Sequence, residues 1–169
     1  INVDFQVINV DVDESINKNE SGLDYCLRVA VAKAQAGWHC PQRTQNLPVL
    51  GSDTTVLIND EILTKPDNKE HAGQMLRKLS NSTHQVVTAV AIVLNNKIMH
   101  VISITDVSFA SLSEHEIKDY INSGESMGRS GGYSIQGQIS KYIKRISGSY
   151  SGVVGLPLYE TAKLLTNFN

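Results

Sequence analysis

The stretch that decides the fold is HQVVTAVAIVLNNKIMHVISITDVSF, residues 84–109. Residues 84–94 and 97–109 are two long runs rich in valine, isoleucine and threonine, and Asn95-Asn96 separates them. Two such runs joined by two turn-forming residues are typical of a β-hairpin. The sheet is therefore expected to contain antiparallel neighbours, unlike the purely parallel sheet of a doubly wound fold.

Shorter elements extend outward from this hairpin on both sides. Asn59-Asp60 predicts a second, shorter hairpin between residues 48–58 and 61–63. Helix caps are expected at Asp67 and Ser113, because each stands three residues before a glutamate. The remaining predicted elements are helices over 22–36 and 157–166 and strands over 4–10, 142–146 and 149–154.

Helix 22–36 has the clearest helical pattern outside the hairpins. Ser21 and Gly37 are its expected caps. Its expected buried stripe is Leu23, Leu27, Ala30 and Ala34. Together the elements predict an α/β fold of the mixed α+β kind, in which helices flank a long, mixed and largely antiparallel sheet. The 169 residues suit one domain over 1–169.

Composition excludes several classes of protein. Hydrophobic residues make up 41% and charged residues 19%, which argues against a disordered chain. The net charge of −2 makes general binding to nucleic acid or anionic membrane unfavourable. No apolar run reaches the roughly 18 residues of a spanning helix, and the start has no secretory pattern. We expect no nucleic-acid partner and no membrane partner.

The cysteines and histidines do not form a zinc pattern. Cys26 and Cys40 form no CxxC pair, and the five histidines have no HExxH spacing. A disulfide is one interpretation of the two cysteines. We favour two free thiols in a reducing, cytoplasmic compartment.

Three polar positions are candidates for chemistry, and each also has a structural explanation. Asp53 follows an apolar strand, where open sheets place catalytic groups, but an acid there can also close a turn. Lys65 lies in a Thr-Lys-Pro break and is either a site residue or a solvated lysine. Glu14, beside two aspartates, offers the oxygen ligands that Mg²⁺ or Mn²⁺ prefers, or belongs to a solvated loop.

The other candidates lie on the first helix and in a glycine-rich segment. Arg28 and Lys33 are about 140° apart around a helix, so they do not share a face, and Lys33 either reaches a cleft or covers the edge of the core. Residues 123–137 hold five of the 12 glycines and predict a long functional loop. In this loop Gln136 offers a donor and an acceptor that suit the edge of a base. Gln138 stands where a P-loop needs lysine, which excludes a P-loop.

Several stretches, in this order, resemble the Maf family of nucleoside triphosphate pyrophosphatases. They are Asp13-Glu14, Arg28-Val-Ala with Lys33-Ala, Gly51-Ser-Asp53-Thr-Thr-Val, Lys65-Pro66, Met75–Ser80 with Thr83-His84, Gly131–Gly137 and Gly148–Leu158. They span nearly the whole chain. The Gly-Ser-Asp-Thr-Thr start and the Tyr-Ser-Ile-Gln-Gly loop are most similar to the branch that acts on dTTP and UTP.

The resemblance implies hydrolysis of a nucleoside triphosphate to the monophosphate and pyrophosphate, with a divalent metal, in a two-lobed fold with a central cleft. It implies that Asp53 is the general base and that Thr54 and Gln136 select the pyrimidine. It implies metal binding for Glu14 and phosphate binding for Lys33 and Lys65. Two lysines and one metal would supply the positive charge that attack on the α-phosphorus needs. The implied partner is the triphosphate substrate, and a homodimer stays open.

The sequence departs from the family pattern in places. The family has a strand and a Ser-x-Ser-Pro-Arg-Arg loop before the position of Phe5, and this sequence starts after that point. Ile1–Asn169 alone is therefore expected to be less active and more prone to self-association than a protein that carries this segment. Gly128-Arg129 replaces Asp-Lys, and Val31-Ala32 replaces Arg-Glu.

These departures leave two other functions open. One is a catalytically impaired nucleotide-binding regulator of cell division, because the family is also linked to inhibition of septum formation. The other is a phosphatase that acts on a different phosphoester. The leading hypothesis remains a pyrophosphatase that removes modified nucleotides or adjusts nucleotide pools.

Overall fold

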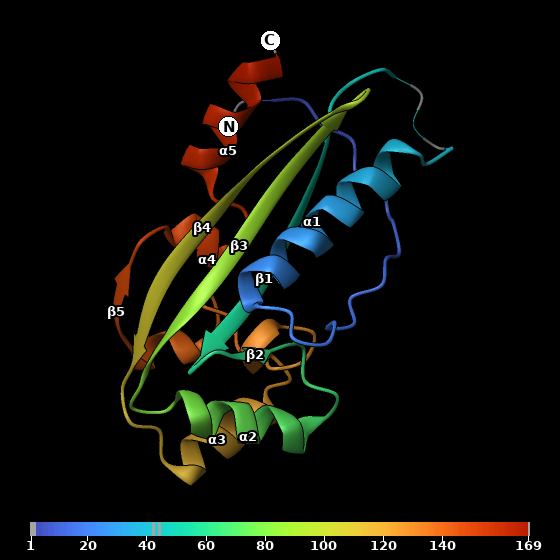
Figure 1. Cartoon of the computed structure of the whole chain (residues 1–169). Coiled ribbons are helices and arrows are strands. Elements are labelled where there is room, and N and C mark those ends of the chain that lie inside the picture. Colours follow the sequence, from blue (N-terminus) through green and yellow to red (C-terminus); the bar gives the residue numbers. More distant parts are fainter. Residues whose placement is uncertain (1–2, 42, 44, 169) are drawn as a thin grey trace.

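A five-stranded sheet forms the centre of the protein (Figure 1). The computed structural model describes residues 3–41, 43 and 45–168. The strands are β1 (Val49–Ile58), β2 (Glu61–Leu63), β3 (Thr83–Leu94), β4 (Lys97–Phe109) and β5 (Ile143–Ser147), in the order β2-β1-β3-β4-β5. Each of the four described strand pairings is antiparallel.

Helices flank this sheet. They are α1 (Gly22–Trp38), α2 (Lys69–Leu79), α3 (Glu114–Asn122), α4 (Tyr150–Val154) and α5 (Leu158–Leu165), with short 3₁₀ turns η1 (Ser130–Gly132), η2 (Gln138–Tyr142) and η3 (Thr166–Phe168). In Figure 1 α1 lies along the long strands, and α2 and α3 lie together at the lower end of the sheet. The α/β fold with helices on a long sheet is confirmed.

The predicted hairpin of residues 84–109 is confirmed as β3 and β4. Their register runs from Thr83 opposite Ser108 to Leu94 opposite Lys97. Asn95 has a φ of 52°, the left-handed conformation that tight hairpin turns need and that asparagine tolerates. The shorter hairpin between β1 and β2 turns through Asn59 in the same way, at a φ of 50°.

The two faces of β3 belong to different parts of the core. Ala89 and Ala91 pack under α1, in a cluster that also contains Ala30 and Ala34 of that helix. The alternate residues of β3, Val90 and Ile92, pack with Leu164 of α5. Because successive side chains of a strand point to opposite faces, this pattern places α1 and α5 on opposite sides of the sheet.

The largest core cluster lies at the end of the sheet that α2 and α3 cover. It includes Met75, Leu76 and Leu79 of α2, Ile117 and Tyr120 of α3, Phe109 of β4, and Tyr133, Ile135 and Ile139 of the glycine-rich segment. The glycine-rich segment is therefore anchored in the core although it contains little regular structure. This anchoring fixes the position of the loop that approaches β1.

Two of the predicted strands are not strands. Residues 4–10 have no regular structure, and Phe5 and Val7 are 82% and 77% exposed, so their alternating pattern finds no partner among the described strands. Residues 150–154 form helix α4 because the Ser149 hydroxyl accepts a hydrogen bond from the Gly152 N–H and caps a helical turn.

The helix boundaries also differ in detail from the prediction. Asn68, and not Asp67, caps α2 through its side chain. Gly37 lies inside α1, which continues to Trp38. Leu23 is 37% exposed, because the buried face of α1 is shifted toward Cys26 and Val29. The Ser113 capping box with Glu116 is confirmed.

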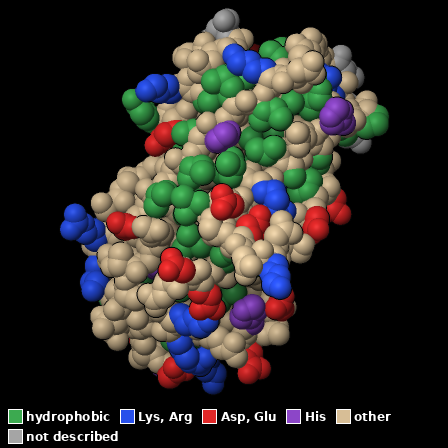
Figure 2. All heavy atoms as spheres, viewed as in Figure 1, with side chains coloured by type: hydrophobic (Ala, Val, Ile, Leu, Met, Phe, Trp, Pro, Cys, Tyr) green, Lys and Arg blue, Asp and Glu red, His purple; other side chains and the backbone are tan. Residues whose placement is uncertain are grey.

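The face of the protein seen in Figure 2 carries no single dominant charge. Figure 2 shows acidic and basic side chains intermixed on the visible face, with hydrophobic side chains exposed over its middle and upper parts. Cys26 and Cys40 are both free, as expected. Within the described ranges, no helix combines the length and the apolar character that crossing a bilayer needs.

Folding stability is expected to fall as the pH drops from about 6.5 to about 4, because His84 is buried in the largest core cluster. Burial lowers the pKa of His84 from 6.5 to about 4, and Nε2 lies 2.7 Å from the Tyr133 hydroxyl. Between these pH values the unfolded chain binds a proton that the folded protein excludes, so stability is lost as the pH falls. The loss is on the order of 3 kcal/mol.

Urea denaturation at pH 7, 5.5 and 4 measures this dependence. His84→Gln should flatten the pH dependence relative to wild type, whereas His115→Gln, at an exposed position, should leave it unchanged. Equal pH slopes for wild type and His84→Gln would show that the buried histidine does not cause the loss.

Candidate active site

Asp53 and Thr54 lie in the middle of β1. The sequence suggested that Asp53 comes just after a strand, but β1 continues to Ile58, and Asp53 pairs in register with Ala89 of β3. Among the described strands, β2 pairs with β1 only through Val56–Ile58. Asp53 and Thr54 lie beyond this pairing and line a cavity, and their side chains point to opposite faces of the sheet.

A row of alternating charges connects Asp53 to three other elements. Lys33 Nζ of α1 lies 2.7 Å from Asp53 Oδ1 and 2.7 Å from Glu14 Oε1. The other carboxylate oxygen of Glu14 lies 2.7 Å from Lys65 Nζ, in the segment after β2. Four candidates far apart in sequence thus form one contiguous group.

The environment of this row shifts the pKa values of its members. Burial raises the pKa of Asp53 above its ordinary value, and the neighbouring Lys33 ammonium only partly opposes this. Burial also acts to raise the pKa of Glu14, but its hydrogen bonds to Lys33 and Lys65 outweigh it, so the net pKa is lowered. Burial acts to lower the pKa of Lys33, yet the two carboxylates raise it overall. Lys33 therefore stays charged, and Asp53 is the carboxylate that more readily takes up a proton.

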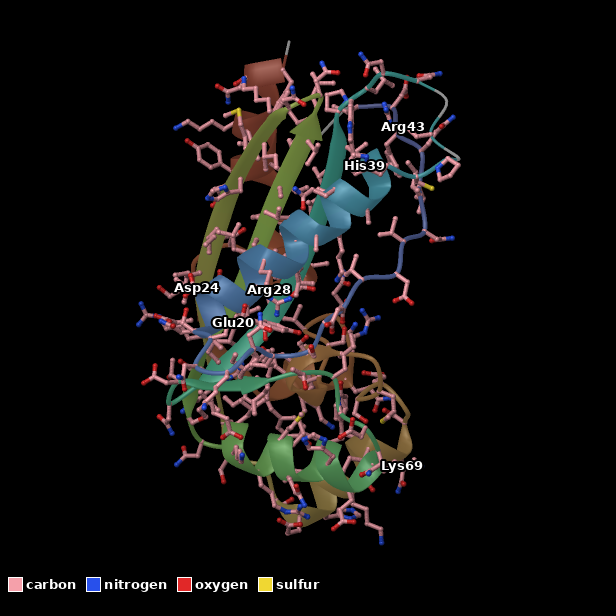
Figure 3. All side chains as sticks on the ribbon, turned by 45° about the vertical axis from the view of Figure 1, so that its right-hand side comes forward. Glu20, Asp24, Arg28, His39, Arg43 and Lys69 are labelled. Atoms are coloured by element: carbon pink, nitrogen blue, oxygen red, sulfur yellow. The ribbon has the colours of Figure 1, made fainter. Side chains whose placement is uncertain are left out.

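Arg28 holds the segment that carries Glu14. Its guanidinium pairs with Glu20, with Nε to Oε1 at 2.6 Å, and donates to the Ser15 carbonyl at 2.7 Å. Figure 3 shows Glu20 and Arg28 side by side near the start of α1. The Tyr25 hydroxyl donates to the Glu14 carbonyl at 3.1 Å. Arg28 and Tyr25 thus position Glu14, and Arg28 contacts the same segment that Lys33 reaches through Glu14.

The glycine-rich segment closes the other side of the site. The Ser130 hydroxyl donates to the Thr54 carbonyl at 2.8 Å, and the Gly131 N–H donates to the Thr64 carbonyl at 3.1 Å. Gly131 has a φ of 71°, and a Cβ there would lie 2.9 Å from a methyl group of Val56. Only glycine suits both the conformation and the close approach, so this position fixes the loop against β1.

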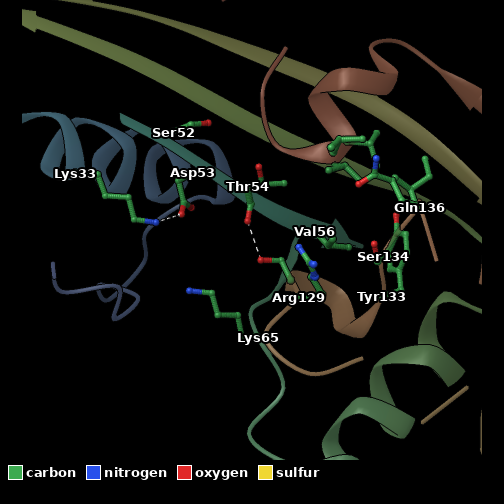
Figure 4. A pocket seen from close by; sticks show the side chains of 16 residues that line it. Lys33, Ser52, Asp53, Thr54, Val56, Lys65, Arg129, Tyr133, Ser134 and Gln136 are labelled. Carbon is green, nitrogen blue, oxygen red and sulfur yellow. Dashed lines mark hydrogen bonds and ion pairs between the residues drawn. The ribbon is translucent and has the colours of Figure 1, made fainter. Parts of the chain in front are cut away.

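Two cavities lie between these elements, and Figure 4 shows the residues that line the first of them. The first has a volume of about 240 Å³, and five of the six site residues predicted from the sequence line it: Lys33, Asp53, Thr54, Lys65 and Gln136. The second has about 320 Å³ and is lined by the sixth, Glu14. Asp53, Thr54, Lys65 and Ser130 line both cavities. The second cavity is at the lower end of the range of about 300–1,000 Å³ that is usual for small-molecule sites, and the first is slightly smaller.

The first cavity is also lined by residues that the sequence analysis did not assign to the site. Arg129 and Ser130 line it from the glycine-rich segment, and Ser52 lines it from β1. The basic residue in a run of glycines was a visible signal for Arg129. Ser52 and Ser130 had none, because small hydroxyl residues are common in turns and strands.

A divalent metal would have to bind through the carboxylates of this site. The described residues contain no group of three or more His, Cys, Asp or Glu side chains that could hold one. However, Mg²⁺ is commonly bound by one or two carboxylates, with phosphate oxygens and water completing its coordination. Lys33 Nζ already occupies the position of a cation between Asp53 and Glu14. Glu14, the more exposed of the two, is therefore the carboxylate that fits a metal arriving with phosphate oxygens.

Fold and site define a class: an α/β protein with a small-molecule cleft in which lysines and carboxylates face a glycine-rich loop. The chain belongs to the Maf family, since the family described as Maf-like protein matches residues 1–168. It is 47% identical to proteins named dTTP/UTP pyrophosphatase from Shigella dysenteriae and from Escherichia coli O6:K15:H31. A Shigella flexneri protein named nucleoside triphosphate pyrophosphatase is equally similar. Each alignment covers the whole of this chain and 85% of the relative.

Proposed function

We propose that residues 1–169 act as one domain that hydrolyses dTTP and UTP to the monophosphate and pyrophosphate. The observation that carries this proposal is the row from Asp53 through Lys33 and Glu14 to Lys65, beside a cavity that Gln136 also lines. The row offers a general base for the attacking water and two cations for the phosphates. Gln136 offers an amide for the nucleobase. The names of the relatives that are 47% identical support the same substrates.

Asp53 is the proposed general base. Water attacks the α-phosphorus and gives a proton to the Asp53 carboxylate. The bond between the α-phosphorus and the bridging oxygen breaks, and that oxygen leaves with pyrophosphate. Because burial raises the pKa of Asp53, its carboxylate is a stronger proton acceptor than an exposed aspartate.

The cations of the site bind the triphosphate. Lys33 and Lys65 are point charges that face phosphate oxygens, and Arg129 adds a guanidinium from the glycine-rich segment. Glu14 would hold a divalent metal, Mg²⁺ or Mn²⁺, together with phosphate oxygens, and the metal supplies further charge neutralisation when bound. Preorganised positive charge lowers the free energy of a transition state in which negative charge develops on oxygen.

The pyrimidine base of the nucleotide is recognised at the other end of the cavity. The Gln136 amide donates to a ring carbonyl of uracil or thymine, and Thr54 lies between Gln136 and Asp53 in Figure 4. The free cysteines fit a reducing, cytoplasmic compartment, which we include in the proposal.

Pyrophosphate release from dTTP, UTP, CTP, ATP and GTP in the presence of Mg²⁺ tests the function. We expect release of pyrophosphate and monophosphate, fastest with dTTP and UTP. Binding of UTP without hydrolysis would favour a regulatory nucleotide-binding protein. Release of orthophosphate from a phosphomonoester, without pyrophosphate release, would favour a phosphatase.

Lys65→Ala is expected to raise KM for the triphosphate about tenfold, because Lys65 is a cation of the cavity. The side chain is 53% exposed and packs little, so the melting temperature should change by less than a few degrees. Initial rates and thermal denaturation measure both effects.

Lys78→Ala is the matched control for this variant. Lys78 is also a half-exposed lysine paired with a glutamate, Glu61, but it lies on α2 and lines neither of the two cavities. It should keep the wild-type KM. If Lys65→Ala loses stability and keeps full activity, Lys65 has a structural role instead.

A further inference from the structure

A buried hydroxyl relay runs from the cavity into the core. Thr54 Oγ1 lies 2.9 Å from Thr88 Oγ1 on the neighbouring strand β3, and Thr88 Oγ1 donates to the Gly152 carbonyl of α4 at 2.7 Å. Thr88 is 0% exposed. The relay therefore connects a residue that lines both cavities to a backbone group that cannot change its hydrogen-bonding role.

The relay has only one proton arrangement that satisfies both contacts. A carbonyl oxygen accepts and never donates, so the single hydroxyl proton of Thr88 must point to Gly152. Thr88 can then only accept from Thr54, and the Thr54 proton points away from the cavity toward Thr88. The reverse arrangement would place two oxygens 2.7 Å apart without a proton between them.

Thr54 therefore presents only lone pairs to a ligand. Thr54 lines the first cavity together with Ser52 and Val56, the alternate residues of β1 whose side chains point to the same face of the sheet. A ligand atom next to this hydroxyl is favoured when it carries a proton to donate. A ligand acceptor at the same place would face another acceptor.

We propose that Thr88 is a positioning residue for base selection: it fixes Thr54 as an acceptor and so favours uracil and thymine over cytosine. Uracil and thymine have a donor at N3, where cytosine has an acceptor. This inference rests on the proposed function for the identity of the ligand. The acceptor role of the Thr54 hydroxyl follows from the relay alone.

The relay makes binding of cytosine unfavourable, because turning the Thr54 hydroxyl toward the ligand would break a buried hydrogen bond. To donate to cytosine N3, Thr54 would have to withdraw its proton from Thr88, which would leave a fully buried oxygen without its donor. Sites that hydrogen-bond their substrate discriminate mainly through such unpaired groups. Without the Thr88 hydroxyl, the Thr54 proton is free to rotate toward the cavity.

Thr88→Val tests the inference, because valine keeps the shape of threonine and removes the hydroxyl. We expect the UTP:CTP ratio of kcat/KM to fall about tenfold, chiefly through a gain with CTP. The ratio of Kd values for the two nucleotides, measured by calorimetry without metal, should fall by a similar factor. Thr88→Ser, which keeps the hydroxyl, should retain the wild-type ratio.

Thr55→Val is the matched control. Thr55 is the next residue of β1 and is 1% exposed, and its hydroxyl has no hydrogen-bond partner among the described residues. This variant also removes a buried threonine hydroxyl from the sheet, but that hydroxyl is not part of the relay. It should leave the UTP:CTP ratio unchanged.

A double-mutant cycle separates the relay from a general packing effect. In a Thr54→Val background, Thr88→Val should have no further effect on the ratio, because the hydroxyl that Thr88 orients is absent. An effect that persists in this background would overturn the inference. An unchanged UTP:CTP ratio in folded Thr88→Val would also overturn the inference. If the valine variant does not fold, Thr88→Ala provides the same comparison.

Binding and hydrolysis together distinguish failure of this inference from failure of the proposed function. A wild-type protein that prefers UTP in binding but releases no pyrophosphate would contradict the proposed activity and leave the Kd ratio as the test of the relay. A wild-type protein that shows no preference for UTP over CTP, in hydrolysis or in binding, would overturn the inference. A protein that binds neither nucleotide would overturn both.

Discussion

Asp53→Asn is expected to lower kcat by about 10²- to 10⁴-fold while the protein stays folded. Asparagine has nearly the same shape, and its amide oxygen can still accept from Lys33, but it cannot take a proton from water. Lys33 also keeps its contact with Glu14 at 2.7 Å, so it is not left without an anion. Steady-state rates with UTP, together with a thermal denaturation curve, measure the two halves of this expectation.

The pH profile gives an independent check on the role of Asp53. The base works only when deprotonated, so activity should be lost as the pH falls through its pKa. Because burial raises this pKa, with Lys33 opposing, the loss should begin at a higher pH than for an exposed aspartate of pKa 3.8. The residual activity of Asp53→Asn should lack this acidic limb.

Asp106→Asn is the control for the loss of a carboxylate. Asp106 lies on β4, where Gln85 donates to it, and it lines neither of the two cavities. The control should keep the wild-type rate and pH profile. Wild-type turnover in Asp53→Asn at unchanged stability would exclude Asp53 as the general base.

The long hairpin and the capped helices could be predicted because their signals are local. Residues 84–109 combine β-rich runs with a two-residue turn, and the Ser113 box is complete within four residues. The prediction for residues 4–10 was wrong because alternation alone does not supply a partner strand. The prediction for residues 149–154 was wrong because the capping role of Ser149 outweighed the β preference of the two valines that follow.

The candidate site could be predicted as a set of residues, but its connections could not. Asp53, Lys33, Glu14 and Lys65 came from their local context and from the family resemblance. Their order in the charge row depends on how α1 and the segment before it pack on β1, which no short stretch encodes. The Thr88 relay is a contact across 34 residues of sequence, between two threonines that are ordinary strand residues when taken singly.

Gly51 connects the fold to the site and gives the second prediction with a large effect. A methyl group on Gly51 would lie 2.5 Å from both the Ala30 carbonyl oxygen and the Ala34 nitrogen. These are backbone atoms of α1, so they cannot move aside as the end of a side chain can. The small residues Ala30 and Ala34 let α1 approach β1 closely, and Gly51 completes this contact.

Gly51→Ala is therefore expected to lower the free energy of unfolding by about 3 kcal/mol, at the upper end of the usual cost of overpacking. Strand propensity alone predicts the opposite sign, because glycine weakens a strand relative to alanine. Urea denaturation decides between the two. Leu50→Val, at the neighbouring position, which is 40% exposed, should change stability by less than about 1 kcal/mol.

The same substitution should affect activity beyond the loss of folded protein. If α1 moves away from β1, Lys33 moves with it, and its 2.7 Å contact with Asp53 lengthens. The pKa of Asp53 then rises further, because burial remains while the neighbouring cation recedes. The acidic limb of the pH profile should accordingly shift to higher pH in Gly51→Ala. Wild-type stability together with an unshifted profile would show that α1 and β1 tolerate a methyl group between them, and that the position of Lys33 does not depend on Gly51.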